Sequence, residues 1–343
     1  MKKLSLMILT ISGLSFGGAA WAQSSSPLST VSKALSDFSQ SVAPALPSLA
    51  ASSLTWSDAY IGQLIALPPH FGVGASVQAI FLPIKGIDSL FSAFGIAEPA
   101  PLTAFGSLGV PFPAYAVEAR IGGIVLPFDL GLKFGTIPTN VSSLTGSFAI
   151  NYLLWGAELR WDILKDAAIV PGLSIGASYS NLSGAFYYTM SDITLGSVPT
   201  GPSTTSNIAL SKPTVGFEWQ TSVVELNAQI SKNLVVITPY AGVGASLSWA
   251  KAGGGFYATP TIGGAAMTQA QMAYLQSNFP NNPAVASVTN SGIDIQFQQS
   301  NVFSFRAFGG VSINIVIVRL DLGVSYNFSS QSLGGDFGLR FQL

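Results

Sequence analysis

Charge is scarce in this sequence. Only 8% of its 343 residues are Asp, Glu, Lys or Arg, against about 25% in soluble globular domains. Hydrophobic residues make up 48%, and the mean hydropathy is +0.48. A surface that faces water ordinarily carries more charge than this. We therefore expect much of this surface to face something other than water.

Cysteine is absent, and histidine occurs once, as His70. The absence of cysteine excludes disulfides, thiolate metal sites, cysteine catalysis and lipoprotein acylation. One histidine cannot form a conventional metal cluster, and no serine lies in a nucleophile elbow. The net charge of −1 comes without a cluster of Lys and Arg, which argues against nucleic acid as a partner. We expect no enzymatic activity, no cofactor and no metal site.

A long apolar run suited to a membrane helix is also missing. The most apolar long stretch, residues 233–250, has Pro239, Gly242 and Gly244 in its interior, and these residues disfavour a helix. Its residues alternate instead, which is typical of a strand. One face of that strand carries Pro239, Ala241, Val243, Ala245, Leu247 and Trp249.

The same period of two recurs along the chain. Apolar residues alternate with Gly, Ser and single charges in residues 69–79, 115–122, 128–135, 155–162, 172–179, 303–312, 319–328 and 336–343. Phe308 breaks the alternation in one of these segments. Residues 217–230 are apolar first at 217 and 219 and then at 224, 226, 228 and 230, so we predict a β-bulge near Thr221.

Two architectures produce such alternation, a soluble sandwich or barrel and a membrane barrel with an apolar exterior. The polar faces here consist mainly of Gly and Ser, which suits a narrow lumen better than a solvated surface. The connections alternate between short ones, such as 231–234 and 314–318, and long ones, such as 191–213 and 251–296. A membrane barrel shows this regularity. We predict an all-β fold, a transmembrane antiparallel up-and-down β-barrel of about ten strands with a short, partly helical N-terminal segment; 8 to 14 strands are compatible with the pattern.

The chain divides into three predicted parts. Residues 1–22 have the features of a signal peptide, with Lys2 and Lys3 before an apolar stretch and Ala20-Trp21-Ala22 as the cleavage site. Residues 69–343 form the barrel. Residues 23–68 between them are a periplasmic leader near the barrel mouth, a plug inside the lumen, or an extra pair of strands. Two connections carry short helix candidates, at 84–96 and 268–279, which either form an apolar funnel over the outer mouth or pack as a lid.

Thirteen charged residues fall on the polar side of the alternation. We predict that they face the lumen, either as a structural ion-pair network or as a constriction that gates solutes. Neighbouring strands would bring the first pair of this set, Glu118 and Arg120, beside the second pair, Asp129 and Lys133, and would likewise bring the last four residues close to one another. The set is Glu118, Arg120, Asp129, Lys133, Glu158, Arg160, Asp162, Glu225, Arg306, Arg319, Asp321, Asp336 and Arg340.

The last ten residues, 334–343, alternate and end with Phe341 and Leu343. This ending resembles the C-terminal assembly signal of bacterial outer-membrane β-barrel proteins, although the preferred last residue there is Phe. The resemblance implies lipid as the surroundings, the barrel-assembly machinery as a partner and the bacterial outer membrane as the location. Omptin proteases are also ten-stranded barrels, but their Asp and His residues lie at the outer rim, whereas His70 is predicted at the opposite end.

Ten strands lie just above the size at which side chains fill a barrel, and well below the 16 to 18 strands of open porins. We therefore expect a narrow channel or transporter for small or hydrophobic solutes. Outer-membrane fatty-acid transporters are similar in having an N-terminal plug and helical outer loops, but they use more strands. The alternative is a surface or structural barrel without transport, which stabilises the membrane or binds partners through its loops.

Overall fold

The computed structural model describes residues 27–52, 56–61, 70–82, 110–123, 127–137, 148–200, 203–282, 284–285 and 292–343. Its helices are α2 (Pro27–Val42), α3 (Leu46–Ser52) and α7 (Gln269–Asn278). Its strands are β1 (His70–Leu82), β2 (Val110–Gly122), β3 (Phe128–Thr136), β4 (Phe148–Leu164), β5 (Gly172–Thr189), β6 (Ile193–Pro199), β7 (Thr205–Ser231), β8 (Ile237–Ile262), β9 (Ala265–Ala266), β10 (Gly292–Ile315), β11 (Val318–Asn327) and β12 (Ser332–Gln342). The predicted signal peptide, residues 1–22, and the helix candidate 84–96 lie outside these ranges.

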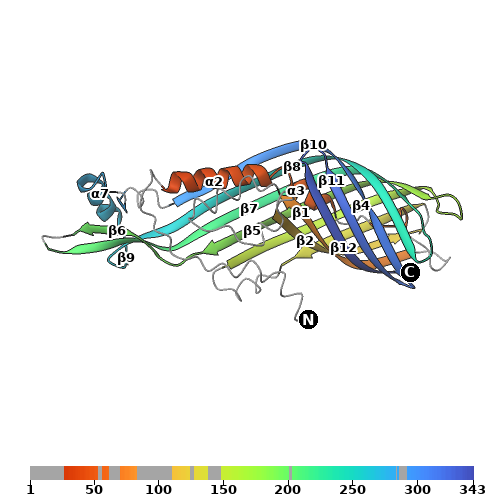
Figure 1. The fold of residues 1–343 in the computed structure, drawn as a ribbon, viewed down its shortest axis with the longest axis horizontal. Coiled ribbons are helices and arrows are strands. Elements are labelled where there is room, and N and C mark those ends of the chain that lie inside the picture. The colour runs from red at the N-terminus through yellow and green to blue at the C-terminus, as the bar shows by residue number, and fades with distance from the viewer. Residues whose placement is uncertain are drawn as a thin grey trace.

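The described strands form a closed antiparallel ring (Figure 1). Going round it, the order is β1, β2, β3, β4, β5, β7, β8, β10, β11 and β12, and β12 pairs again with β1. Each strand pairs with its neighbour in the chain once β6 and β9 are set aside. The ring confirms the predicted up-and-down barrel of about ten strands and leaves no open edge in the ring itself.

Three strands of the ring are much longer than the rest. β7, β8 and β10 have 27, 26 and 24 residues, whereas a membrane-spanning strand needs about 9–11. They project together beyond one end of the barrel, which we call the outer end, with β6 and β9 at their sides and α7 near the tip (Figure 1). The predicted long loops 191–213 and 251–296 were therefore wrong in large part, since both contain strand.

The opposite end, which we call the inner end, carries short connections. β10 and β11 are joined through a two-residue turn, and β7 and β8 through residues 232–236. In outer-membrane barrels short turns face the periplasm and longer loops face outwards. The chain ends at this end as well, where the Leu343 amide donates to the carbonyl of Phe71 at 2.9 Å.

The two faces of the ring differ in chemistry. Large apolar side chains are exposed on the outside, at positions such as Val117, Leu226, Val243 and Val324. Gly, Ser and charged residues alternate with them and point into the lumen. Lipid on one side and a packed interior on the other explain the period of two that the sequence shows.

The predicted bulge near Thr221 is wrong. The pairing of β5 with β7 runs without a shift from Thr214 to Ser231, and the irregularity in β7 lies between Ser211 and Thr214 in its pairing with β8. Phe217 and Trp219 point into the lumen, as Glu225 does further along the strand. The face does not change along β7; the lumen changes from apolar to polar.

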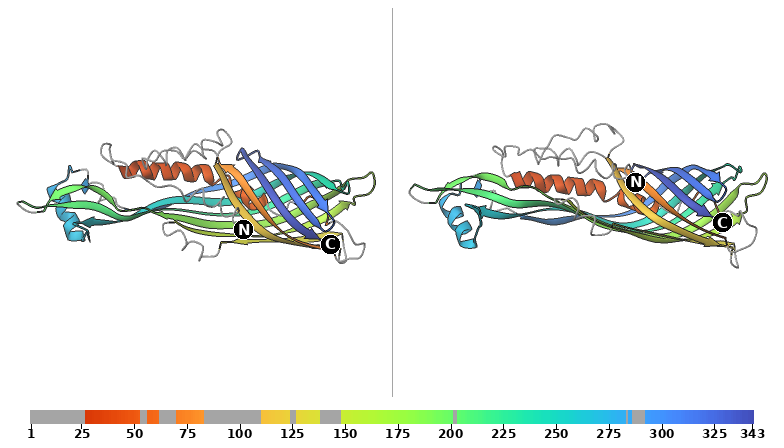
Figure 2. Two further views of the ribbon diagram at one scale, coloured as in Figure 1. Left: turned by 60° about the horizontal axis from the view of Figure 1, so that its bottom comes forward. Right: turned by 90° about the horizontal axis from the view of Figure 1, so that it is seen from below.

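The N-terminal helices lie against the inside of this scaffold. α2 runs along the projecting strands, where it packs on β8 and β10, and α3 sits within the ring (Figure 2). Residues 56–61 continue towards the inner end of the barrel, where Ile61 contacts the start of β3. The predicted helix at 268–279 is observed as α7; its Leu275 packs with Val198 of β6 and Ile208 of β7, away from the barrel mouth.

Candidate functional site

Four charges at the inner end of the lumen form a compact buried network. Arg120 of β2 pairs with both Asp129 of β3 and Glu158 of β4. Arg160 of β4 reaches the same aspartate, with 2.8 Å between Nη2 and Oδ2. All four side chains are almost completely buried, so each charge depends on its partners, because an unpaired buried charge is costly.

A second pair lies across the lumen. Arg306 of β10 makes a two-pronged contact with Glu225 of β7, at 2.8 and 2.7 Å. Arg306 also donates to the carbonyl of Ala51 at 3.4 Å, and the Lys133 ammonium donates to the carbonyl of Ala50. The last turn of α3 is thus held by two cations of the barrel wall.

A third cluster needs the N-terminal segment for its charge balance. Arg319 of β11 and Arg340 of β12 are direct partners in the strand register, and like charges in that position repel. Asp58 pairs with both, at 2.9 Å to Arg319 and 3.1 Å to Arg340. Asp321 pairs with Arg340 from the wall at 2.8 Å. The barrel therefore has two adjacent arginines that one carboxylate of the N-terminal segment holds together.

Trp56 lies between two guanidinium groups. The Cζ atoms of Arg120 and Arg340 are 5.5 and 4.7 Å from the centroid of its ring, within the range of a cation–π contact. Its indole N–H donates to Glu118 at 2.5 Å. A Cβ atom at Gly72 would lie only 2.8 Å from the Trp56 ring, so glycine in β1 makes room for the tryptophan.

Main-chain hydrogen bonds fix the rest of this segment. Gln229 of β7 donates to the carbonyls of Trp56 and Ser57 at 2.6 and 3.1 Å. The amide of Ala59 donates to Ser231 at 2.8 Å, and the amide of Ile61 to Asp129 at 3.1 Å. Lumen side chains thus satisfy backbone groups that a segment without its own regular structure would leave unpaired. We call α3 together with residues 56–61 the plug.

The outer part of the lumen is apolar. Phe38 of α2 packs edge-on against Phe217 at 4.8 Å between ring centroids, and Phe186 of β5 stacks on the same ring at 5.5 Å. Leu46 and Leu49 of α3 are fully buried in this core. The core continues along the projecting strands, where a Cβ atom at Gly254 of β8 would meet the Leu35 side chain at 2.7 Å.

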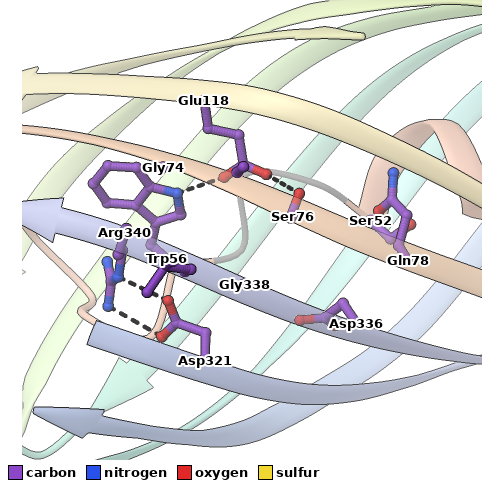
Figure 3. A pocket seen from close by; sticks show the side chains of 12 residues that line it. Ser52, Trp56, Gly74, Ser76, Gln78, Glu118, Asp321, Asp336, Gly338 and Arg340 are labelled. Carbon is purple, nitrogen blue, oxygen red and sulfur yellow. Dashed lines mark hydrogen bonds and ion pairs between the residues drawn. The ribbon is translucent and has the colours of Figure 1, made fainter. Parts of the chain in front are cut away.

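The described residues leave little free space in the lumen. A polar cavity of about 20 Å³ lies between the plug and the seam of β1 and β12 (Figure 3). That volume suits one or two water molecules, because a single water needs about 10–15 Å³ on this measure. A small organic solute does not fit in this cavity.

The structure places twelve of the thirteen predicted lumen charges in the buried interior, and Asp336 is partly exposed towards the cavity. It joins Arg120 to Asp129, and Asp321 to Arg340, as the strand order predicts. Asp162 has no hydrogen-bond partner among the described residues. Asp58 and Trp56 of the plug were not predicted as site residues, because no local pattern in the sequence relates them to strands far along the chain.

The remaining predicted residues lie at the inner end. His70 begins β1 and is buried, beside Gly123. Phe341 is half exposed on the lipid side of β12 and pairs with Val73 of β1 and Val318 of β11. The C-terminal segment that resembles an assembly signal is thus the strand that closes the ring.

The side chains on the outside of the ring indicate what surrounds the protein. Apolar side chains cover the outside of the ring on every strand, and most of the charged groups inside it are paired. This combination suits a bilayer and would be unstable in water. The chain is an outer-membrane β-barrel. Among the helices of the described residues, none combines the length and hydrophobicity needed to span a bilayer.

Comparisons with known proteins give only low similarity. No family model and no curated protein matches this sequence. The chain is similar to the attachment invasion locus protein Ail of Yersinia pestis, with 9% identity, a TM-score of 0.27 and coverage of 80% of this chain and 97% of Ail. It is also similar to the translocator domain of the autotransporter NalP from Neisseria meningitidis, with 9% identity, a TM-score of 0.29 and coverage of 91% of this chain and 97% of that domain. The toluene transporter TbuX of Ralstonia pickettii has 10% identity and a TM-score of 0.26, with coverage of 82% of this chain and 90% of TbuX. These structures are bacterial outer-membrane barrels, and their similarity to this chain is too low to indicate a function.

Proposed function

We propose that this barrel admits small apolar solutes across the outer membrane, and that the plug moves to let them pass. The observation that carries the proposal is the division of the lumen. An apolar, aromatic region at the outer end, with Phe38 and Phe217 at its centre, leads to a charged region that the plug closes. An apolar solute would gain free energy by leaving water for the outer region.

The contacts of the plug support reversible movement. It is held by ion pairs, one aromatic side chain and hydrogen bonds to single side chains, and no strand of the described ring pairs with it. Its departure would break these contacts without opening the barrel wall. Each lumen charge of the wall would then face water, where the loss of a partner costs much less than in a dry interior.

A tether between plug and wall tests this proposal. A Cβ atom at Gly172 of β5 would lie 3.5 Å from the Cβ of Ala59, which is a suitable separation for a disulfide. Because the chain has no cysteine, the pair Ala59→Cys and Gly172→Cys would contain the only two thiols. A matched control is Ala241→Cys with Gly309→Cys, whose Cβ separation of 3.6 Å joins two strands already paired in the wall.

The measurement is the influx of a radiolabelled small aromatic hydrocarbon into intact bacteria that produce the protein. We expect faster influx than in cells without it, a return to that background when the Ala59–Gly172 tether is oxidised, and recovery on reduction. The control tether should leave influx unchanged. Influx equal to background in the untethered protein would overturn the transport proposal, and influx unaffected by the tether would overturn plug movement.

One observation favours the alternative of a surface or structural barrel. The outer projection has its own apolar core, in which Val198, Ile208 and Leu275 are buried together. A projection with an independent core can present a stable surface outside the membrane. Loss of cell adhesion or membrane integrity on removal of its tip, with unchanged hydrocarbon influx, would favour this second function. In both cases we propose a protein without enzymatic activity.

A further inference from the structure

The small cavity beside the plug is lined by more acids than its surroundings neutralise. Glu118, Asp321 and Asp336 all line it, together with Gln78 and Arg340 (Figure 3). Arg340 is engaged with Asp321 and with Asp58 of the plug. Glu118 accepts hydrogen bonds from Trp56 and Ser76. Asp336 has no ion pair among the described residues.

Inside the barrel as a whole, acidic side chains also outnumber basic ones. Asp58 raises the number of lumen carboxylates among the described residues to eight, against six cationic side chains. Three of these acids have no ion pair among the described residues, namely Glu118, Asp162 and Asp336. Glu118 accepts two hydrogen bonds, so Asp336 is the acid of the cavity that has neither an ion pair nor a hydrogen bond from the described residues. A negative charge in a lumen shielded from water requires a counter-charge or a proton.

Gln78 supplies an independent observation. It is only 2% exposed, and neither its amide oxygen nor its amide nitrogen has a hydrogen-bond partner in the described protein. Burying an amide without partners is costly, so such a group in a native protein indicates a bound water or ion. Gln78 lines the cavity and is the direct strand partner of Asp336, which places the two side chains about 5 Å apart at Cβ on the same face.

The space beside Asp336 is kept open by a glycine. A Cβ atom at Gly323 would lie 2.4 Å from Oδ1 of Asp336 and 2.6 Å from the Tyr240 hydroxyl. Any larger residue in this position of β11 would push the carboxylate aside. The carboxylate, the amide and the cavity of about 20 Å³ therefore lie together at the seam where β12 closes on β1.

We propose that this cavity binds one small hard cation, an alkali ion such as Na⁺, between the carboxylate of Asp336 and the amide oxygen of Gln78. Oxygen donors of this kind select hard cations over transition metals. Glu118 is already held by two hydrogen-bond donors, and the one remaining carboxylate, that of Asp336, matches a single positive charge. No three His, Asp or Glu side chains of the described residues converge as a metal site, which disfavours a cage for a divalent ion, and water completes the coordination.

Sodium binding to the purified full-length protein in detergent tests the site. Thermal unfolding and ²³Na relaxation are followed while Na⁺ replaces choline at constant ionic strength. We expect the midpoint of unfolding to rise with Na⁺, because a ligand that binds only the folded state stabilises it. In Asp336→Asn and in Gln78→Leu the apparent affinity for Na⁺ should fall by about tenfold or more.

Asp162→Asn is the matched control, because it removes an acid that has no ion pair but does not line the cavity; its Na⁺ response should equal that of the wild type. A wild-type protein indifferent to Na⁺, K⁺ and Ca²⁺ would overturn the site and leave water or a protonated Asp336 in its place. A response to Ca²⁺ without one to Na⁺ would overturn the assignment to a monovalent ion. Equal Na⁺ responses in Asp336→Asn and the wild type would also overturn the site.

Discussion

The lumen of this barrel has two regions that are filled by different kinds of contact, paired charges in one and apolar packing in the other. At the inner end, charged side chains of the wall pair with one another and with the plug. At the outer end, aromatic and aliphatic side chains pack around α2 and α3 as in the core of a soluble protein. One strand, β7, contributes to both, through Glu225 and Gln229 at one end and Phe217 and Trp219 at the other.

The difference shows that the direction of a side chain and its polarity are separate properties in this fold. Lipid determines the polarity of the outside along the ring, so the exterior of the ring is uniformly apolar. The polarity of the inside depends on what fills the lumen at each level. Apolar helices fill the outer region, and a segment rich in backbone hydrogen bonds fills the inner one.

The largest effect is expected in the inner region, from Arg120→Leu. The change leaves Asp129 and Glu158 without their shared partner in a buried site, and breaking such a network costs about 3–5 kcal/mol. Urea unfolding in lipid vesicles measures this loss in the free energy of unfolding. Lys232→Leu is the control, because its pair with Asp166 lies at the partly exposed inner rim and should cost no more than about 1 kcal/mol. Equal losses in the two variants would contradict a special role for the buried network.

A slightly smaller effect is expected in the outer region, from Phe217→Ala. Phe217 is completely buried between Phe38 and Phe186, and removing a buried aromatic ring costs about 3 kcal/mol. We also expect α2 to loosen from the projection, so that limited proteolysis cuts it faster. Leu226→Ala on the lipid face of the same strand should leave the cutting rate unchanged; faster cutting there would show that α2 responds to general destabilisation.

Asp58→Asn tests whether the ion pairs of the plug keep the lumen closed. The change keeps the shape of the side chain but leaves Arg319 and Arg340 without the charge that they share. The loss of charged hydrogen bonds costs about 2 kcal/mol. If the plug is the gate, stepwise conductance in planar bilayers should become more frequent. Asp37→Asn, on the exposed side of α2, serves as the control and should conduct like the wild type.

The smallest effect is expected from Lys33→Ala. Lys33 and Asp37 form an i,i+4 pair at 2.8 Å on the outside of α2, and exposed pairs of this kind contribute about 0.5 kcal/mol or less. A thermal scan should show a change near the error of the measurement. A large loss would mean that α2 is held by charge and not by its apolar face.

The sequence predicts the barrel well because its exterior is uniform. Residues such as Val243, Leu247 and Trp249 alternate with small polar residues in β8, and lipid imposes that period on every strand. The same alternation placed the lumen charges on one side before any contact was known. Short connections at one end and long excursions at the other then predicted the ring, although the excursions 191–213 and 251–296 contain strand.

The sequence is less informative where the lumen is filled by the protein itself. Around Phe217 and Trp219 apolar helices cover the inner face, whereas the outer face carries Glu218 and Gln220. The apolar side of the alternation therefore switches along β7 although the strand stays regular, which led to the mistaken bulge near Thr221. The ion-pair partners of Asp58 lie more than 250 residues away in the chain, and no local pattern relates them. Gln78 and Asp336 become neighbours only through the closing pair of strands.

Hydrogen exchange of residues 46–61 in lipid nanodiscs, followed by mass spectrometry, tests the central claim most directly. If the plug is packed in the lumen as its bonds to Gln229, Ser231 and Asp129 indicate, its amides should exchange about as slowly as those in the middle of β7. Exchange at the rate of an unstructured peptide, in a protein whose strands stay protected, would contradict a closed lumen.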